Sequence, residues 1–373
     1  MTVREAMESV PVVVVGAGPA GLATSAELMR RGVRHVVLER GPEVAYSWVN
    51  AYDSLTLHTG RHMSTLPGMP FPRGTPLFPS RLQFVDYLRA YAERLALPVR
   101  LNEEVHAVEH GPGGWLARTS SGAIRARSLV WATGIMANPR RPRFPEEERF
   151  RGEILHSVAY RRPEGFAGRR VLVIGVGNSG GEIGSELARA GARVTVAVRS
   201  GANVVPRSLL GVPIQYLGYV VRKLPRPAAR AVTAFVGGLT RIRRGAPVLP
   251  RPAHGPLDAI PLIGFALVDA IRDGSVAVKP GVERFTEEGA RFTDGSERMF
   301  DTILLATGFS PMLSPLAGLV TTDAAGFARR TDRVTSSDQP DLYFVGHNYD
   351  ATGGLFNIRR DAEIVAARIA GTR

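Results

Sequence analysis

The sequence predicts an α/β protein with two nested Rossmann-like dinucleotide-binding domains, of which the first is interrupted by the second. Two observations predict this class. A unit of strand, glycine-rich turn, helix and strand is centred on Gly16 and is repeated around Gly175. In addition, two apolar strands end in Ala-Thr-Gly segments at residues 132–134 and 306–308, where small residues allow the chain to turn sharply.

The first unit begins with the apolar run at residues 10–15, which is too short for a signal peptide and is interpreted as a buried strand. Gly16 permits a tight turn, Gly18 lets the backbone approach a pyrophosphate, and Gly21 allows close packing of helix on strand. The N-terminus of the helix offers free N–H groups to the phosphates. Glu39 lies 23 positions after Gly16 (39 − 16), where its carboxylate accepts hydrogen bonds from ribose and repels a 2′-phosphate. This site therefore suits FAD or NAD.

The second unit carries the same glycines at Gly175, Gly177 and Gly180, but its second strand leads to Arg199 in place of an acid. Arg199 lies 24 positions after Gly175 (199 − 175). An arginine pairs with a 2′-phosphate, so this site suits NADP. Arg207 is a second candidate for the same phosphate.

The Ala-Thr-Gly segments are interpreted as crossings between the two domains. We expect the FAD domain over residues 1–160 and 306–373 and the NADPH domain over residues 161–305. The C-terminal part should hold a strand that ends at Gly346 and a glycine-rich turn at residues 352–354, which leads into a final helix.

Composition excludes several classes. The 373 residues carry a net charge of +13 but include only two lysines and no nucleic-acid-binding module, so no nucleic-acid partner is expected. The absence of cysteine excludes disulfide reductases with a redox-active Cys pair, and no His/Asp/Glu cluster predicts a metal site. No stretch reaches the roughly 18 apolar residues of a membrane span, so a cytoplasmic protein is expected.

The chain resembles the class B flavin monooxygenases, especially their heteroatom-oxygenating branch and the plant YUCCA enzymes. The spans 51–100 and 253–312 also look like YUCCA. The family signature F-x-G-x-x-x-H-x-x-x-[F/Y] is matched just before the second glycine turn by Phe150, Gly152, His156 and Tyr160.

The resemblance implies FAD and NADPH as cofactors and O2 plus a small organic molecule as substrates. NADPH would reduce the flavin, O2 would add to form a C4a-peroxyflavin, and retained NADP+ would protect that adduct from water. The YUCCA-like stretches imply oxidative decarboxylation of an α-keto acid such as indole-3-pyruvate. N- or S-oxygenation of an amine or thioether stays open, as does an NADPH-dependent quinone or electron-transfer reductase.

Catalytic roles are assigned to His58, His156 and Asn178. His58 stands where the heteroatom-oxygenating branch usually carries an Asn near the flavin, a change that YUCCA-like enzymes share; an ordinary packed histidine is the other interpretation. For His156, the resemblance implies coupling of NADP binding to flavin chemistry rather than general-base catalysis. The residues expected to bind the two cofactors are Gly16, Gly18, Pro19, Ala20, Gly21, Glu39, Arg40, Trp48, Thr133, Gly134, Gly175, Gly177, Asn178, Ser179, Gly180, Arg199, Ser200, Arg207, Thr307, Gly308, Gly346, Gly354 and Leu355.

The Pro- and Arg-rich segment 201–259 aligns only loosely with the family. Its aliphatic stretches at residues 212–224 and 228–242 have roughly helical spacing. They are consistent with a lid over the substrate, a dimer face or a membrane-surface helix, and the lid is the favoured interpretation. The protein is expected to be a monomer or a homodimer.

Overall fold

The computed structural model describes residues 7–136, 138–221, 223–250, 252, 261–348, 350 and 352–372. The chain forms two compact units, and the second is inserted into the sequence of the first. Unit 1 comprises Met1–Asn138, Phe309–Tyr349 and Gly353–Arg373, and unit 2 comprises Pro139–Gly308 and Asp350–Thr352. Each unit contains a parallel sheet and one glycine turn, which confirms the predicted fold class of two nested Rossmann-like domains. The predicted domain boundaries at residues 160 and 305 stay a prediction.

Unit 1 is built on a seven-stranded sheet in the order β3-β2-β1-β6-β5-β4, with β19 also paired to β6. Strands β1, β2, β3, β6 and β19 run parallel, whereas β4 and β5 extend the sheet in antiparallel fashion. The strands are β1 (Glu8–Val15), β2 (His35–Leu38), β3 (Val99–Arg100), β4 (Val105–Gly111), β5 (Gly114–Thr119), β6 (Gly122–Trp131) and β19 (Leu342–Phe344).

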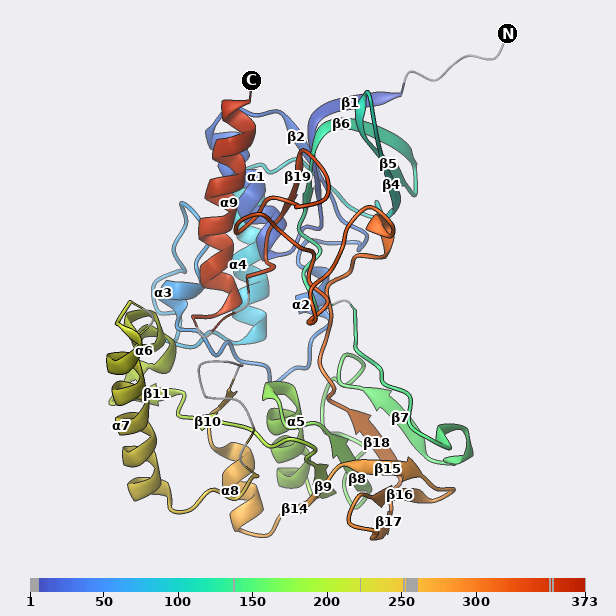
Figure 1. Ribbon diagram of the computed structural model, residues 1–373, viewed down its shortest axis with the longest axis vertical. Coiled ribbons are helices and arrows are strands. Elements are labelled where there is room, and N and C mark those ends of the chain that lie inside the picture. The colour runs from blue at the N-terminus through green and yellow to red at the C-terminus, as the bar shows by residue number, and fades with distance from the viewer. Residues whose placement is uncertain are drawn as a thin grey trace. The chain divides into compact units, whose positions relative to one another are not determined.

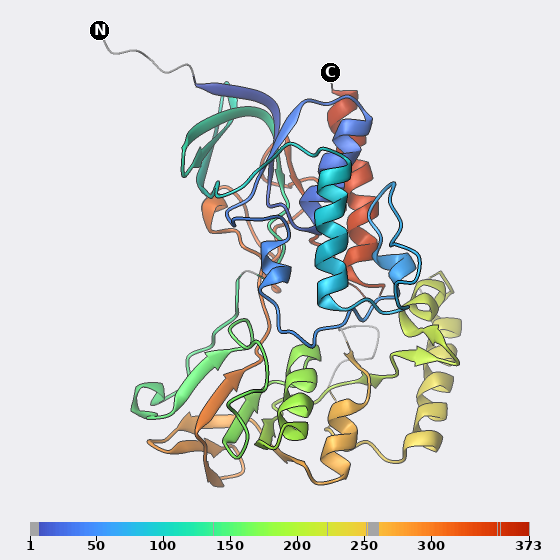
Figure 2. The ribbon, with the colours of Figure 1, turned by 180° about the vertical axis from the view of Figure 1, so that it is seen from behind.

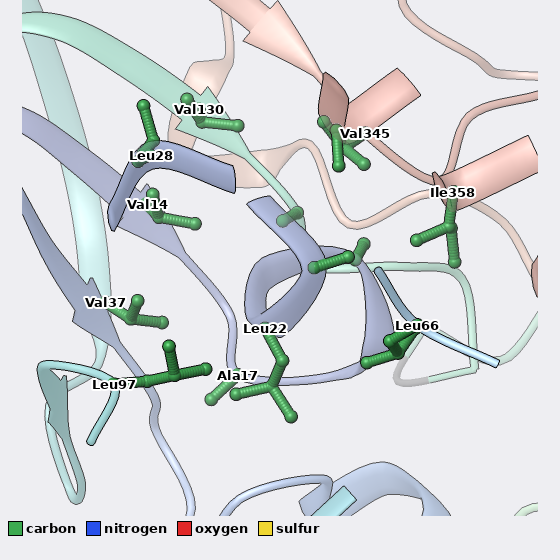
Figure 3. Packing of buried hydrophobic residues seen from close by; sticks show 14 of the residues in the cluster. Val14, Ala17, Leu22, Leu28, Val37, Leu66, Leu97, Val130, Val345 and Ile358 are labelled. Carbon is green, nitrogen blue, oxygen red and sulfur yellow. The ribbon is translucent and has the colours of Figure 1, made fainter. Parts of the chain in front are cut away.

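Three long helices of unit 1 lie side by side in Figures 1 and 2, namely α1, α4 and α9. Apolar side chains from these helices and from the sheet form one buried cluster, which includes Val14 of β1, Leu22 of α1 and Ile358 of α9 (Figure 3). The helices are α1 (Pro19–Arg30), α2 (Tyr46–Val49), α3 (Arg61–Ser64), α4 (Arg81–Arg94) and α9 (Gly354–Gly371), with a 3-10 turn η2 (Ser314–Leu316).

Unit 2 contains a five-stranded sheet, all parallel, in the order β14-β9-β8-β18-β7. Small sheets accompany it: β15-β16-β17, β10-β13 and β11-β12. The strands of the main sheet are β7 (Glu153–His156), β8 (Arg170–Ile174), β9 (Arg193–Ala197), β14 (Val276–Lys279) and β18 (Thr302–Leu305). The other strands are β10 (Val204–Val205), β11 (Ser208–Leu209), β12 (Val212–Pro213), β13 (Leu262–Ile263), β15 (Val282–Phe285), β16 (Gly289–Phe292) and β17 (Glu297–Met299).

The helices of unit 2 include two in the Pro- and Arg-rich segment, where the helical spacing of the sequence is thus confirmed. Residues 253–259 of that segment lie outside the described residues. Within the described part of the chain, no helix is long and apolar enough to cross a membrane. The helices are α5 (Asn178–Arg189), α6 (Ile214–Val221), α7 (Arg226–Arg244) and α8 (Ala266–Arg272), with a 3-10 turn η1 (Glu147–Arg149).

Candidate dinucleotide sites

The first glycine turn joins the end of β1 to the start of α1. Gly16 has φ +100°, and a Cβ there would lie 2.8 Å from the carbonyl oxygen of Ala132, at the end of β6. A Cβ on Gly21 would overlap the carbonyl oxygen of Gly16. These two glycines are therefore required by the protein's own packing, whether or not a ligand is bound.

Gly18 differs from Gly16 and Gly21, the other two glycines of the motif. It is the N-cap of α1, with an ordinary extended backbone (φ −77°, ψ −174°), and a Cβ on it would meet no described atom within 4 Å. No contact with a described residue therefore requires glycine here. The open space lies directly before the first N–H groups of the helix, where a pyrophosphate would approach.

Glu39 directly follows β2 and is buried beside this turn. One carboxylate oxygen accepts a hydrogen bond from the N–H of Ala17 (2.8 Å), and the other accepts one from the N–H of Gly41 (2.9 Å). Each oxygen keeps a further lone pair for a ribose hydroxyl. Arg40, the next residue, is exposed.

The C-terminal part of the chain returns to the edge of the sheet at which the first glycine turn lies. Because β1 and β19 both run parallel to β6, α1 and α9 both begin at the carboxyl ends of their strands. Gly346 follows β19 with φ +87°, and a Cβ on it would lie 3.4 Å from the Cβ of Ala20 in α1. Gly346, which the sequence places at the end of a strand, thus lies two residues beyond β19 and next to the first turn of α1.

The start of α9 meets the segment that contains His58. Gly353, the N-cap of α9, has φ +94°, and a Cβ on it would lie 3.0 Å from the hydroxyl oxygen of Thr59. Gly354 is the first residue of the helix, and Leu355 is buried. His58 itself is half-buried. The structure therefore brings its segment to a second helix N-terminus in unit 1.

Three further residues that were expected to bind cofactor, Thr133, Gly134 and Trp48, have structural explanations in unit 1. The hydroxyl of Thr133 donates to the carbonyl of Met312 (3.2 Å), and Gly134 has φ +65°. Trp48 packs edge-on against Phe84, with ring centroids 4.7 Å apart. The indole is therefore held by the core of the unit.

The second glycine turn, between β8 and α5, repeats the geometry of the first. Gly175 has φ +107°, and a Cβ on it would lie 2.5 Å from the carbonyl oxygen of Ala306. A Cβ on Gly180 would overlap the carbonyl oxygen of Gly175, whereas one on Gly177, the N-cap of α5, would meet nothing within 4 Å. Both turns thus contain two structurally required glycines around one open position.

The residues expected at the NADP phosphate lie on the segment that follows β9. Arg199 and Ser200 are exposed two and three residues after the strand, which ends at Ala197. Arg207 is half-buried, and burial lowers the pKa of its guanidinium while the charge of Glu182 in α5 opposes that shift. Arg199 is therefore the more accessible cation for a phosphate.

Asn178 and Ser179 occupy the first turn of α5. The side-chain oxygen of Asn178 accepts a hydrogen bond from the N–H of Ile263 in β13 (2.8 Å). This contact fixes the side chain against the backbone. It gives Asn178 a positioning role at the mouth of the second turn, and the assigned catalytic role stays a prediction.

The family signature has a packing explanation at three of its four positions. Phe150 is buried in the core, and a Cβ on Gly152 would lie 2.7 Å from the carbonyl oxygen of Asp301. The Tyr160 hydroxyl donates to a carboxylate oxygen of Glu186 in α5 (2.8 Å). These residues fix the segment around β7 on the rest of unit 2.

His156, the fourth position, is buried at the end of β7. Its Nδ1 accepts a hydrogen bond from the N–H of Val158 (3.2 Å), so its Nε2–H donates to the carbonyl of Gly308 (3.2 Å). The same carbonyl accepts from the N–H of Arg140 (2.9 Å). Burial lowers the pKa of His156, so the imidazole is neutral near pH 7. Backbone groups therefore hold the imidazole at both of its ring nitrogens.

Sequence reasoning missed a buried ionic network behind the loop that follows β19. Asp361 of α9 is fully buried and accepts from Arg333 Nε (2.9 Å) and Asn348 Nδ2 (2.6 Å). Burial raises the pKa of the Asp361 carboxyl, and Arg333 and Asn348 oppose that shift. The network joins the loop to α9. Three residues so far apart carry no motif, so no sequence signal could have found it.

The residues present fit two dinucleotides. Each unit offers one open glycine at a helix N-terminus, which is the cradle that a pyrophosphate would fill. The two cradles differ in charge. The buried carboxylate of Glu39 borders the cradle of unit 1, whereas in unit 2 the exposed guanidinium of Arg199 follows β9. No group of three or more metal-ligating side chains occurs among the described residues.

Comparisons with known proteins agree with this geometry. A family model described as pyridine nucleotide-disulphide oxidoreductase matches residues 13–208. The chain is 39% identical over 308 residues to indole-3-pyruvate monooxygenase YUCCA1 of Oryza sativa subsp. japonica. The aligned region covers 80% of this chain and 76% of that protein.

Solved structures give the same picture. The flavin-containing monooxygenase from Stenotrophomonas maltophilia is 27% identical, with a TM-score of 0.78 over 98% of this chain and 99% of that chain. Bacillithiol disulfide reductase from Bacillus cereus, 22% identical, has a TM-score of 0.73 over 98% of this chain and 100% of that chain. This second likeness concerns the fold alone, and the chain described here contains no cysteine.

Proposed function

Because the chain belongs to the flavin-containing monooxygenase family, in its YUCCA-like group, we propose that it uses FAD and NADPH to oxidise an α-keto acid with O2. Indole-3-pyruvate is the proposed substrate, since the similar rice protein is named for it. The overall reaction converts the keto acid, O2, NADPH and a proton into the shortened carboxylic acid, CO2, NADP+ and water. The observation that carries the cofactor assignment is the pair of open glycine cradles with opposite neighbouring charges.

In this proposal, each unit binds one dinucleotide by the same physical means. The N–H groups at the start of α1 receive the FAD pyrophosphate next to Gly18, and Glu39 accepts hydrogen bonds from the adenosine ribose. The N–H groups at the start of α5 receive the NADPH pyrophosphate next to Gly177, and Arg199 pairs with the 2′-phosphate. The cofactor supplies O2 activation after reduction by NADPH.

The role proposed for His156 is to position the chain where it leaves unit 2. Gly308, whose carbonyl accepts its proton, is the last residue of the second Ala-Thr-Gly segment. The N–H of Arg140, which follows Pro139 where the chain enters unit 2, donates to the same carbonyl. His156 thereby stabilises this arrangement without exchanging a proton with substrate.

The test of this function is the yield of product per NADPH consumed. Holoenzyme is mixed with NADPH and, in separate reactions, indole-3-pyruvate, an alkylamine or a thioether. Catalase is added throughout, because free hydrogen peroxide decarboxylates α-keto acids without an enzyme. We expect about one indole-3-acetate per NADPH and little product from the other two. Efficient oxygenation of the amine or thioether alone would contradict the keto-acid assignment.

Variants of His156 test its proposed role in the same assay with catalase present, and hydrogen peroxide formation is counted as the NADPH that is oxidised without product. His156→Ala removes the hydrogen bonds to Val158 and to Gly308. Loss of the bond to Gly308 alone, worth about 0.5–1.5 kcal/mol, should lower the product yield per NADPH about 2- to 10-fold in favour of hydrogen peroxide. His156→Gln keeps an N–H donor near the Nε2 position and should restore much of the yield. An unchanged yield in His156→Ala, or equal losses in both variants, would contradict the role.

A further inference from the structure

Exposed apolar side chains are concentrated in one short part of unit 2. Eleven large hydrophobic residues are exposed in the described part of the chain, and six of them lie between residues 210 and 235. Leu210 is 82% exposed and Phe235 is 72% exposed. A concentration of this kind marks an interaction surface, whereas single exposed apolar residues do not. The six are Leu210, Val212, Tyr219, Val220, Leu224 and Phe235.

The same part of the chain has an extreme charge. Residues 201–250 contain seven arginines and one lysine but no aspartate or glutamate, which gives a net charge of +8. The whole protein carries +13, so these 50 residues hold more than half of its net charge. Among the described residues, Lys223, Arg226 and Arg230 are exposed and form no ion pair. Within the described part of the chain, no acidic group therefore neutralises these three charges.

Most of these residues belong to a part of unit 2 that is here called the basic hairpin and defined as residues 208–221 and 223–244. It consists of the β11-β12 turn, α6 and α7, which lie together in Figures 1 and 2. Leu210 and Val212 are at the β11-β12 turn, and Tyr219 is near the end of α6. The ammonium group of Lys223 lies 4.3 Å from the centre of the Tyr219 ring. A basic group and an aromatic ring thus lie at close range in the basic hairpin.

We propose that the basic hairpin docks the protein reversibly on an anionic phospholipid surface. Apolar side chains that project from a basic surface suit the boundary between lipid headgroups and acyl chains. The absence of acidic residues removes the repulsion that would otherwise oppose contact with an anionic leaflet. A second copy of the chain fits less well, because residues 201–250 contain eight basic and no acidic residues, so a face shared by symmetry would repel itself.

Co-sedimentation of the holoenzyme with lipid vesicles tests the proposal. Vesicles of phosphatidylcholine with about one third phosphatidylglycerol are compared with vesicles of phosphatidylcholine alone, at low and at physiological salt. We expect binding to the anionic vesicles that weakens with salt, and little binding to the neutral ones.

Two double variants divide the surface into its components. Lys223→Gln with Arg226→Gln should weaken partition about 25-fold, at about fivefold for each charge removed. Leu210→Ser with Phe235→Ser should weaken it at least about tenfold, because two side chains no longer enter the apolar boundary. Arg143→Gln with Arg193→Gln is the control for the loss of two charges, and Leu82→Ser is the control for the loss of an exposed apolar side chain. All three residues are exposed and lie outside the hairpin.

The controls should bind as the wild type does, and thermal unfolding of every variant verifies that it is folded. The proposal is wrong if the folded wild type fails to bind anionic vesicles at low salt, or if the controls lose as much affinity as the hairpin variants. It is also wrong if light scattering shows a dimer that the Leu210 and Phe235 substitutions dissociate while vesicle binding is absent. That result would assign the surface to a second copy.

Discussion

Gly18→Ala is expected to raise the dissociation constant of FAD at least about 100-fold while the protein stays folded. The alanine methyl group enters space that is open in the protein, so it strains neither the turn nor the helix. It does occupy the place where a pyrophosphate approaches the first N–H groups of α1. Losing two charge-assisted hydrogen bonds, each worth about 1.5–3 kcal/mol, accounts for the size of the effect.

Matched glycine variants separate the two cradles. Gly177→Ala should leave FAD affinity unchanged and raise the KM for NADPH, because its methyl group enters the corresponding space before α5. Gly21→Ala should instead destabilise the apoprotein, since its Cβ would overlap the carbonyl oxygen of Gly16. FAD titration and thermal unfolding of the apoproteins distinguish these outcomes. Equal FAD affinity in Gly18→Ala and the wild type would refute the assignment of the first cradle.

Arg199→Ala should raise the KM for NADPH about 10- to 150-fold and leave the KM for NADH nearly unchanged. The expected loss is that of one charge-assisted pair with the 2′-phosphate, about 1.5–3 kcal/mol. Arg193→Ala is the control, because Arg193 is also exposed but lies at the opposite end of β9. Steady-state kinetics with both nucleotides provides the measurement.

Two results would count against Arg199. An equal loss with NADPH and NADH would mean that the substitution disturbs the site in general. A rise in the KM for NADPH in Arg207→Ala, without such a rise in Arg199→Ala, would show that the half-buried Arg207 binds the 2′-phosphate instead.

The fold and both glycine turns could be predicted from the sequence because each rule involves a few consecutive residues. Val12 to Val15 form a buried strand, Gly16 and Gly21 enforce a tight turn, and Glu39 follows the next strand at a fixed spacing. The same local rules identified the second turn. Two strand ends were displaced slightly, since β9 stops two residues before Arg199 and β19 stops two residues before Gly346.

The contacts that position these turns could not be predicted, because they join residues far apart in the chain. His156 and Gly308 are 152 positions apart, and Asn178 and Ile263 are 85 apart. Such pairs depend on how strands and loops pack, which no local spacing encodes. Asp361 illustrates the same limit, since its position in α9 predicts a helical residue but not a buried partner for Arg333.

The exposure of the basic hairpin could not be predicted from the sequence either. Its helical spacing is visible in the order of its apolar residues, which predicted α6 and α7. The same spacing is compatible with a helix whose apolar face is covered, and only the folded chain reveals that Phe235 and Leu210 face solvent.

Transfer of an oxygen atom from O2 to the substrate is the central claim, and isotope labelling tests it most directly. Holoenzyme, NADPH, catalase and indole-3-pyruvate are incubated under oxygen-18 gas, and the product is analysed by mass spectrometry. The account predicts indole-3-acetate that contains one oxygen-18 atom per molecule, formed in about equal amount to the NADP+. Complete oxidation of NADPH with no labelled acid, together with rapid electron transfer to an added quinone, would identify a reductase and contradict the account.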